Sequence, residues 1–429
     1  MKLWDKGSTP DKQMDLFTVG NDRELDQVLV EYDLKASRAH AEMLGKIGIL
    51  DSAETEAIVK ELDQMLEEAR SGDFPIEEPF EDMHSKIEYE LTERIGEAGK
   101  KIHTARSRND QILVALQLYL KDTLVDFKTQ TRDLFDLLLN LAEAHKEILL
   151  PGYTHLQVAM PSSFGLWFSA YAESLVDDTY FLRAAYRVAD QNPLGSAAGY
   201  GSSFPIDRDF TTSRMGFATQ KYNVVAAQMG RGKVEKATAM AMASLAGTLG
   251  KMAMDICLYL SQNFAFISFP DELTTGSSIM PHKKNPDLFE LVRAKCNVIQ
   301  GLPNQLALLT TNLTSGYHRD MQLTKALLLP AVEQLRACLE ILTSSLGRIR
   351  INHDILDDPK YDYLFSVDSL DAMVQQGIPF REAYRRMADM IEAGDFRPDK
   401  SLQHTHTGSL GNLCLEEIRN KMEHAWDKE

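Results

Sequence analysis

The chain has 429 residues, of which 44% are hydrophobic, so it can bury a large core divided over two or three domains. Its formal net charge of -17 disfavours nucleic acids and anionic membranes as partners, because both would repel an acidic surface. The four cysteines are widely scattered and form no Cys-x-x-Cys pair, which argues against a disulfide framework or a zinc site and favours a cytoplasmic location. No apolar segment has the character of a signal peptide or a membrane span.

Residues 1–105 predict a helical N-terminal domain. Its clearest helix covers residues 51–70, because Asp51 and Glu54 have the spacing of a capping box and an apolar stripe follows them. The next helical stretch carries His84, which we interpret on sequence alone as a structural histidine.

The longest periodic segment runs from Asp110 to Leu150 and contains neither glycine nor proline. Its apolar residues recur at steps of three and four, which predicts one continuous helix. At about 1.5 Å per residue this helix would span about 60 Å, too long for a compact domain with a single core. We therefore expect a bundle of long helices shared between subunits. Asn109 and His155 flank the segment, so an active site that needs both would draw on more than one subunit.

Four further long helical patterns complete a central domain over residues 106–355. They are predicted over residues 162–190, 226–261, 288 onward with a bend at 301–303, and 321–350 around Pro330. The pattern then shortens to a small helical C-terminal domain over residues 356–429. The predicted fold class is all-α: a central long-helix bundle, with five long helices per chain, flanked by smaller N- and C-terminal helical domains.

Two other patterns do not indicate sites. The glycine-rich segment at residues 195–203 has no strand before it and no βαβ pattern around it, which excludes a dinucleotide-binding loop. His404 and His406 have no third ligand nearby in the sequence, so we expect no metal there.

The segment from Thr275 to Asp287, Thr-Gly-Ser-Ser-Ile-Met-Pro-His-Lys-Lys-Asn-Pro-Asp, is the most informative part of the sequence. Its glycine and prolines exclude regular structure, and the apolar run after Asp287 predicts a helix. A helix N-terminus favours an anion, so the hydroxyl, ammonium and amide groups of this loop suit a substrate carboxylate or a developing oxyanion. Gly-Ser-Ser alone is typical of a surface turn, whereas the full string is far more specific.

Four strings of the sequence, taken together, resemble the fumarase and aspartase superfamily: residues 103–111, 152–157, 193–201 and 276–286. The last contains the shared Gly-Ser-Ser-x-Met-Pro-x-Lys-x-Asn loop. The combination of His-Thr-x-Arg-Ser-Arg-Asn-Asp with Gly-Tyr-Thr-His-Leu-Gln is similar to the argininosuccinate lyase family, and the similarity covers nearly the whole chain. The resemblance implies an all-α homotetramer that splits argininosuccinate into arginine and fumarate, in arginine biosynthesis, without a metal or an organic cofactor.

The resemblance also implies roles for individual residues. It makes Ser277 the catalytic serine, His155 the catalytic histidine and Glu290 the carboxylate that orients the histidine. The N-terminal segment lacks the substrate-binding serine of the family, for which Thr18 is the candidate replacement. The substrate-binding positions carried over are Ser107, Arg108, Asn109, Thr154, Lys283, Asn285, Tyr317, Gln322 and Lys325.

The implied reaction explains these residue types. Cleaving the C–N bond requires removal of a weakly acidic proton beside a carboxylate, which builds negative charge on that carboxylate. Lys283, Asn285 and loop N–H groups suit that charge, and one such donor is typically worth about 3–4 kcal/mol. Ser277 can act as a base only if the loop stabilises its alkoxide, and His155 would protonate the departing guanidinium nitrogen or shuttle protons. The sequence leaves open which of the two is base and which is acid.

Two alternatives remain at this point. Adenylosuccinate lyase, aspartase and fumarase release fumarate and share the signature loop, and only the Arg-Ser-Arg-Asn-Asp and Tyr-Thr-His-Leu-Gln strings argue against them. A non-enzymatic structural protein on the same scaffold is disfavoured by the presence of both Ser277 and His155.

Overall fold

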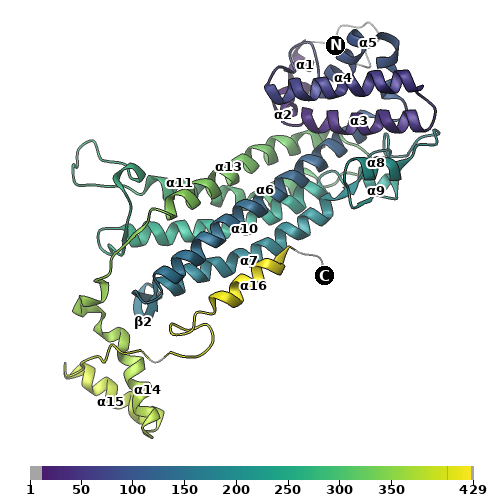
Figure 1. Ribbon diagram of the computed structural model, residues 1–429. Helices are drawn as coiled ribbons and strands as arrows, with labels where there is room; N and C mark the ends of the chain where they lie inside the picture. Colours follow the sequence, from purple (N-terminus) through teal and green to yellow (C-terminus); the bar gives the residue numbers. More distant parts are fainter. Residues whose placement is uncertain (1–11, 403, 427–429) are drawn as a thin grey trace. The chain divides into compact units, whose positions relative to one another are not determined.

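The computed structural model describes residues 12–402 and 404–426, and it is built almost entirely of helices (Figure 1). These residues contain three small sheets, each made of two short strands. The predicted all-α fold class is therefore confirmed. The longest helices are α6 (Arg108–Ala144), α7 (Phe164–Ala189), α10 (Lys233–Leu260) and α13 (Leu323–Leu346).

By its contacts the chain divides into two compact units. The first contains residues 1–128, 181–244 and 298–335, and the second contains residues 129–180, 245–297 and 336–429. The boundary passes through the long helices, so it follows spatial contacts and does not test the three-part division predicted along the sequence.

Three helices near the N-terminus pack against one another in the first unit: α3 (Val30–Lys46), α4 (Ser52–Ser71) and α5 (Met83–Ile95). The capping box predicted for α4 is present, because the Asp51 carboxylate accepts the Glu54 N–H at 2.8 Å and Glu54 accepts the Asp51 N–H at 3.1 Å. Gly72 follows with φ of 85°, a left-handed cap that glycine adopts without strain. The sequence therefore specifies both ends of α4.

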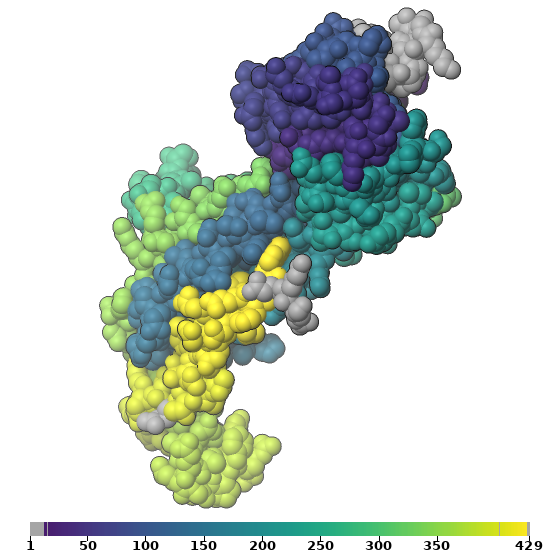
Figure 2. Space-filling model, turned by 45° about the vertical axis from the view of Figure 1, so that its right-hand side comes forward, coloured from purple at the N-terminus to yellow at the C-terminus, as the bar shows by residue number. Residues whose placement is uncertain are grey.

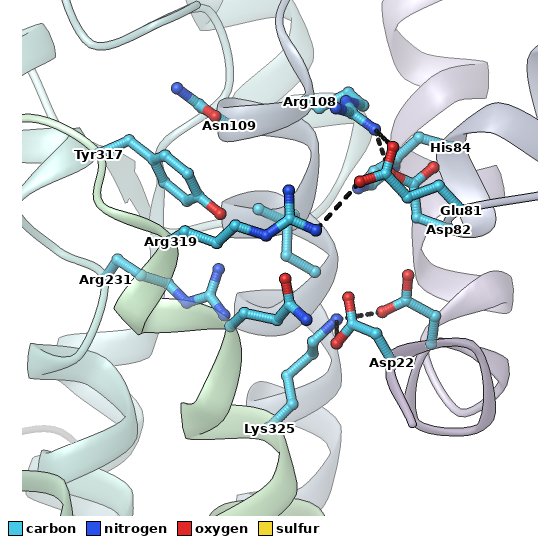
Figure 3. Close-up of a pocket in the computed structure, with 13 residues that line it drawn as sticks. Asp22, Glu81, Asp82, His84, Arg108, Asn109, Arg231, Tyr317, Arg319 and Lys325 are labelled. Atoms are coloured by element: carbon cyan, nitrogen blue, oxygen red, sulfur yellow. Dashed lines mark hydrogen bonds and ion pairs between the residues drawn. The ribbon is translucent and has the colours of Figure 1, made fainter. Parts of the chain in front are cut away.

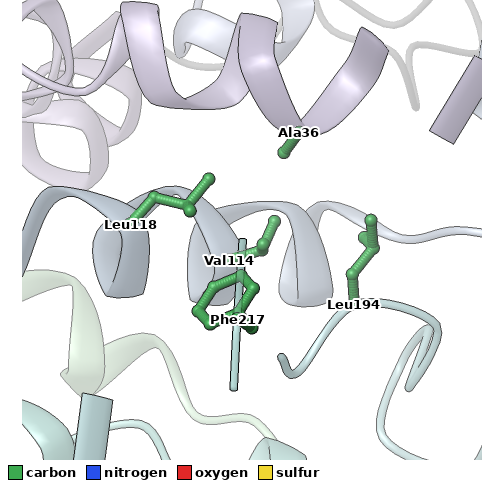
Figure 4. Close-up of a cluster of buried hydrophobic side chains, with 5 residues drawn as sticks. All are labelled: Ala36, Val114, Leu118, Leu194 and Phe217. Atoms are coloured by element: carbon green, nitrogen blue, oxygen red, sulfur yellow. The ribbon is translucent and has the colours of Figure 1, made fainter. Parts of the chain in front are cut away.

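A buried apolar cluster joins α3 and α6 within the first unit (Figure 4). Ala36 of α3 meets Val114 and Leu118 of α6, and Leu194 and Phe217 complete the cluster from the segment after α7. Each large apolar side chain buried in this way typically contributes about 1.5–3 kcal/mol. The cluster lies within ten residues of the start of α6, and it therefore supports the part of that helix where predicted site residues are found.

In the second unit the helices are held by polar contacts as well as by apolar packing. Trp167 and Tyr171 of α7 both donate to the carboxylate of Asp255 on α10, at 3.1 and 2.6 Å. The C-terminal helix α16 (Leu415–Ala425) lies along α7, where Lys421 pairs with Glu173 at 2.5 Å, and it forms the yellow ridge in Figure 2.

The prediction of one helix as far as Leu150 is wrong at its C-terminal end. Helix α6 ends at Ala144, and residues 149–154 form strand β1 (Leu149–Thr154), paired antiparallel with β2 (Gln157–Ser163). The apolar pattern continues past the helix because Leu150 is buried in the hairpin instead. Helix α6 still has 37 residues, so it is about 55 Å long.

Other predicted helices are present with changed ends. The helix expected over 226–261 is divided into α9 (Val224–Gln228) and α10, because Gly230 and Gly232 form a turn between them. The predicted bend at residues 301–303 separates α11 (Asp287–Gln300) from α12 (Leu302–Leu309), and Pro330 lies inside α13. Among the described helices only α10 is long and apolar enough to cross a bilayer, but half of its apolar window is buried inside the protein.

Candidate active site

A polar cavity of about 120 Å³ lies in the first unit (Figure 3). Arg108 and Asn109, at the start of α6, form one wall of it. A second wall comes from the short helix η3 (Arg319–Gln322) and the residues on either side of it, with Tyr317 and Arg319. The complete lining is Asp22, Asp26, Glu81, Asp82, His84, Arg108, Asn109, Ile112, Arg231, Tyr317, Arg319, Gln322 and Lys325. The cavity thus brings together five of the predicted substrate-binding residues from distant parts of the sequence.

Lys325 is buried between two carboxylates of α2 (Asp22–Gln27). Its ammonium is 2.7 Å from Asp22 and also forms an ion pair with Asp26, and Lys325 is only 3% exposed. Burial alone lowers the pKa of Lys325, but the charges of Asp26 and Asp22 raise it above its ordinary value. Burial raises the pKa of Asp22; the charge of Lys325 opposes this rise and that of Asp26 adds to it. Two carboxylates therefore share one buried cation.

The arginines of the cavity are also paired. Arg108 lies 2.6 Å from Asp82 and 3.3 Å from Glu81, and Arg319 binds the other oxygen of Glu81 at 3.1 Å. Arg231 is held by Glu235 at 2.8 Å, with both side chains almost fully buried. These pairs fix the direction of each guanidinium group before any ligand binds.

His84 was expected to be a structural histidine, and it also lines the cavity and belongs to its network of charges. Its Nδ1 donates to Asp33 at 2.9 Å, and both side chains are buried. Burial alone lowers the pKa of His84, but the charges of Asp33, Asp82 and Asp26 raise it above its ordinary value. The same charge of His84, with that of Arg108, keeps the pKa of Asp82 below its ordinary value although burial acts in the opposite direction.

The start of α6 is positioned by the buried carboxylate of Asp110. It accepts the N–H of Ser107 at 2.8 Å and those of Gly195 and Ala197 at 3.0 and 2.8 Å. Burial raises the pKa of Asp110, and these three donors partly offset that effect. The Ser107 hydroxyl accepts the Asn109 N–H at 3.2 Å, so its observed role is to cap the helix that carries Arg108 and Asn109.

Groups of both charges line the cavity. Arg108, Arg231, Arg319 and Lys325 are its cations, and four carboxylates and His84 lie beside them. A cavity of this composition suits a ligand that carries both an ammonium and a carboxylate, because each charge meets an oppositely charged side chain. It is a poor site for a ligand that carries only negative charge.

The signature loop lies in the second unit and leads into α11, as predicted. Its neck is closed by reciprocal backbone hydrogen bonds between Thr275 and Asn285, of 3.2 and 2.8 Å. The Thr275 hydroxyl donates to Asp287, the first residue of α11. The Ser277 hydroxyl oxygen accepts the N–H of Met280 at 3.1 Å and that of Ile279 at 3.4 Å. These donors favour negative charge on the Ser277 oxygen.

Most of the remaining predicted groups are exposed, and no hydrogen bond among the described residues joins one of them to another. Thr154 and His155 lie at the tip of the β1–β2 hairpin, where His155 has φ of 54°. Glu290 is exposed on α11, and among the described residues no hydrogen bond or ion pair joins it to His155. The Lys283 side chain is exposed, and the Asn285 amide faces its own loop, 3.4 Å from the Gly276 carbonyl. The roles assigned to these residues stay predictions.

Comparison with known proteins gives this arrangement its context. A family model described as a lyase matches residues 7–301. The chain is 54% identical to the argininosuccinate lyase of Parabacteroides distasonis, over 98% of this chain and 94% of that one, and 42% identical to that of Xylella fastidiosa, over 97% and 94%. The chain belongs to the argininosuccinate lyase family.

Solved structures agree with this family membership at the level of the fold. An EDDS lyase variant with bound fumarate has a TM-score of 0.79 at 21% identity, covering 98% of this chain and 90% of that one. A class II fumarase from Schistosoma mansoni has a TM-score of 0.72 at 17% identity, covering 96% and 95%. The all-α helical scaffold is therefore shared.

Sequence reasoning gave no site role to the other lining residues, and besides His84 it missed seven of them: Asp22, Asp26, Glu81, Asp82, Ile112, Arg231 and Arg319. Asp22 and Asp26 are spaced by four residues on one short helix, a signal that could have indicated a shared face. Arg319 donates to the Thr18 carbonyl at 3.0 Å, and Gln322 donates to the same carbonyl at 2.9 Å. The Thr18 hydroxyl donates to the Met14 carbonyl within its own helix, and its role as substitute for the family serine stays a prediction.

Proposed function

We propose that this protein cleaves argininosuccinate to L-arginine and fumarate, as a step of arginine biosynthesis in the cytoplasm. The observation that carries the choice of substrate is the mixture of charges in the cavity of the first unit. Argininosuccinate carries an amino-acid end with an ammonium and a carboxylate, and the cavity offers both carboxylates and cations. Adenylosuccinate has a phosphate in place of that end, so it would bring no ammonium to meet the four carboxylates.

The chemistry is supported by the surroundings of Ser277. Backbone N–H groups of Ile279 and Met280 point at its hydroxyl oxygen, and the ammonium of Lys283 belongs to the same loop. Such donors lower the energy of an alkoxide, which a serine needs in order to remove a proton from carbon. His155 then serves as the partner acid or proton shuttle, oriented by Glu290, and Asn285 and Thr154 bind the succinate carboxylates. No cofactor enters this scheme.

We further propose a homotetramer in which each active site takes residues from several subunits. Apolar side chains are exposed on several helices, including Leu291 and Val298 of α11 and Leu308 of α12, each at least 60% exposed. Exposed apolar surface of this kind is typical of an interface between subunits. The length of α6, about 55 Å, also suits a bundle made by more than one chain. Sedimentation of the purified protein measures the assembly directly, and a monomer that is fully active would contradict this part of the proposal.

The substrate is tested by incubating the pure protein with argininosuccinate, adenylosuccinate, aspartate and malate in separate reactions. Fumarate is followed by its ultraviolet absorbance. We expect turnover of argininosuccinate alone. Turnover of another compound in preference to it would assign the chain to a different fumarate-releasing lyase, and no turnover of any of them would favour a structural role.

A further inference from the structure

A second cavity of about 200 Å³ lies in the first unit beside the candidate active site. One wall is the turn between α9 and α10 with the first residues of α10, and the other is the segment after α12, residues 310–317. The two cavities share two lining residues, Arg231 and Tyr317. A ligand in the second cavity would therefore touch groups that also face the substrate.

The charge of this second cavity differs from that of the first. Arg231, Lys233 and Lys236 line it, and no carboxylate does. Glu235 balances Arg231, whereas Lys233 and Lys236 form no ion pair among the residues that the structure describes. The pKa of Lys221 is lowered by burial and by the charge of Lys233, which places a fourth cation near Arg231, Lys233 and Lys236. This local excess of positive charge contrasts with the net charge of -17 of the whole chain.

A buried amide faces the same cavity. Gln228 lines it and is only 2% exposed, and its Oε1 atom has no hydrogen-bond partner. A buried carboxamide without a partner is costly, typically by about 1–3 kcal/mol, unless a ligand or water satisfies it. The terminal oxygen and nitrogen of a glutamine can exchange places, so the same side chain can donate to an anion.

The walls are built tightly around these polar groups. Gly232 has φ of 78°, and a Cβ atom there would lie 2.7 Å from the Thr310 methyl group, so only glycine allows this approach. The N–H of Gly232 already donates to Glu235, and the N–H groups of Lys233 and Val234 donate to Gly230. The contacts to a ligand must therefore come from side chains: the two lysines, Gln228, and the hydroxyls of Thr314 and Ser315.

We propose that the second cavity binds a compact dianion, such as inorganic phosphate or a four-carbon dicarboxylate, and that its occupancy changes the affinity of the neighbouring active site. Two unpaired ammonium groups match two negative charges, and the cavity volume admits a ligand of that size. Because Arg231 and Tyr317 line both cavities, binding in one alters the position or charge of groups in the other. The proposal of an anion site in the second cavity does not rest on which substrate the enzyme cleaves.

The test compares the intact protein with the double variant Lys233→Gln/Lys236→Gln by titration calorimetry, with inorganic phosphate and succinate as separate probes. Lys251→Gln is the matched control, because Lys251 is an exposed lysine on the same helix but does not line the cavity. We expect saturable binding of at least one anion, at one site per chain. The double variant should lose at least about tenfold in affinity, a difference of about 1.4 kcal/mol, and the control should keep it. A second variant, Gln228→Met, should also weaken binding.

A kinetic measurement separates this site from the active site. The double variant should keep the basal kcat and lose the effect of the anion on KM. The inference is overturned if neither anion binds in a saturable manner, or if both bind the double variant as tightly as the intact protein. Purely competitive inhibition with an inhibition constant unchanged in the double variant would also overturn it, because the anion would then occupy the substrate cavity.

Discussion

The ammonium of Lys325 lies 2.7 Å from the carboxylate of Asp22 in the candidate active-site cavity. The same ammonium forms a second ion pair with Asp26, so this lysine, predicted to bind substrate, is already paired with two carboxylates. A substrate that uses Lys325 must therefore also suit Asp22, which makes the carboxylate a part of substrate recognition.

Asp22→Asn is expected to raise KM by about tenfold without loss of thermal stability. Burial raises the pKa of Asp22, so its charged form is disfavoured in the folded protein, and Asp26 still balances Lys325 in the variant. Any gain in Tm should be present at neutral pH and should vanish as the pH falls through the raised pKa, where the carboxyl is already protonated.

Asp26→Asn is the matched comparison. Asp26 is 1% exposed and also accepts the Met83 N–H at 3.2 Å, so this variant should lose about 1–3 kcal/mol of stability. Melting curves and steady-state kinetics of both variants check the pair. An Asp22→Asn variant with unchanged KM would remove that carboxylate from substrate recognition.

His84→Gln is expected to destabilise the protein more at low pH than at high pH. The folded-state pKa of His84 is raised, so its contribution to stability is complete below the unfolded value and is lost as the pH rises through the folded one. The difference in the free energy of unfolding between the intact protein and the variant should therefore be larger at about pH 6 than at about pH 9. Urea unfolding at both pH values measures it, and a difference independent of pH would mean that His84 is neutral in the folded protein.

Ser277→Ala is expected to lower kcat by about 10²- to 10⁴-fold, the usual contribution of a general acid or base. Ser278→Ala provides the control, because Ser278 is an exposed neighbour in the same loop and accepts no hydrogen bond from Met280. Both proteins should melt like the parent. Near-normal turnover of the Ser277 variant would exclude its hydroxyl from the reaction.

Asn109→Ala and His155→Ala should each be nearly inactive, and mixed assemblies of the two should regain activity. Asn109 lies in the first turn of α6, a helix about 55 Å long, and His155 comes in the sequence after the other end of that helix. If each active site takes these residues from different subunits, some sites of a hybrid receive intact copies of both. The two proteins are dissociated, mixed and reassembled, and hybrids are identified by mass spectrometry. Hybrids that form and stay inactive would contradict the shared site.

The long helices could be predicted from the sequence because their apolar periodicity and their capping residues agree. Helix α4 is the clearest case, since Asp51, Glu54 and Gly72 fix its ends by local hydrogen bonds. The β1–β2 hairpin could not be predicted, because Leu149 and Leu150 continue the helical spacing and only their pairing with Ser163 and Ser162 makes them a strand. Local pattern decides the first case, and long-range pairing decides the second.

The part of the candidate site that could be predicted from the sequence consists of residues that lie in short motifs. Arg108 and Asn109 follow directly from one string, and the structure brings them together with Tyr317 and Lys325. Asp22, Arg231 and Arg319 were missed because their importance depends on partners far away in the sequence. The position of Lys325 between two carboxylates, 299 residues distant in the case of Asp26, is visible only in three dimensions.

The candidate active-site cavity can form only late in the synthesis of the chain. Its walls come from residues 22–26, 81–84, 108–112, 231 and 317–325, so the last wall leaves the ribosome when most of the chain has already been made. Asp110, which positions the start of α6, gains two of its three donors only after residue 197 has been added. Before these residues and Lys325 have been added, the carboxylates of Asp110, Asp22 and Asp26 lack these partners, so the nascent chain carries exposed charge where the finished enzyme has paired charge. Incomplete chains therefore cannot bind substrate prematurely, and the last third of the sequence decides when the protein becomes an enzyme.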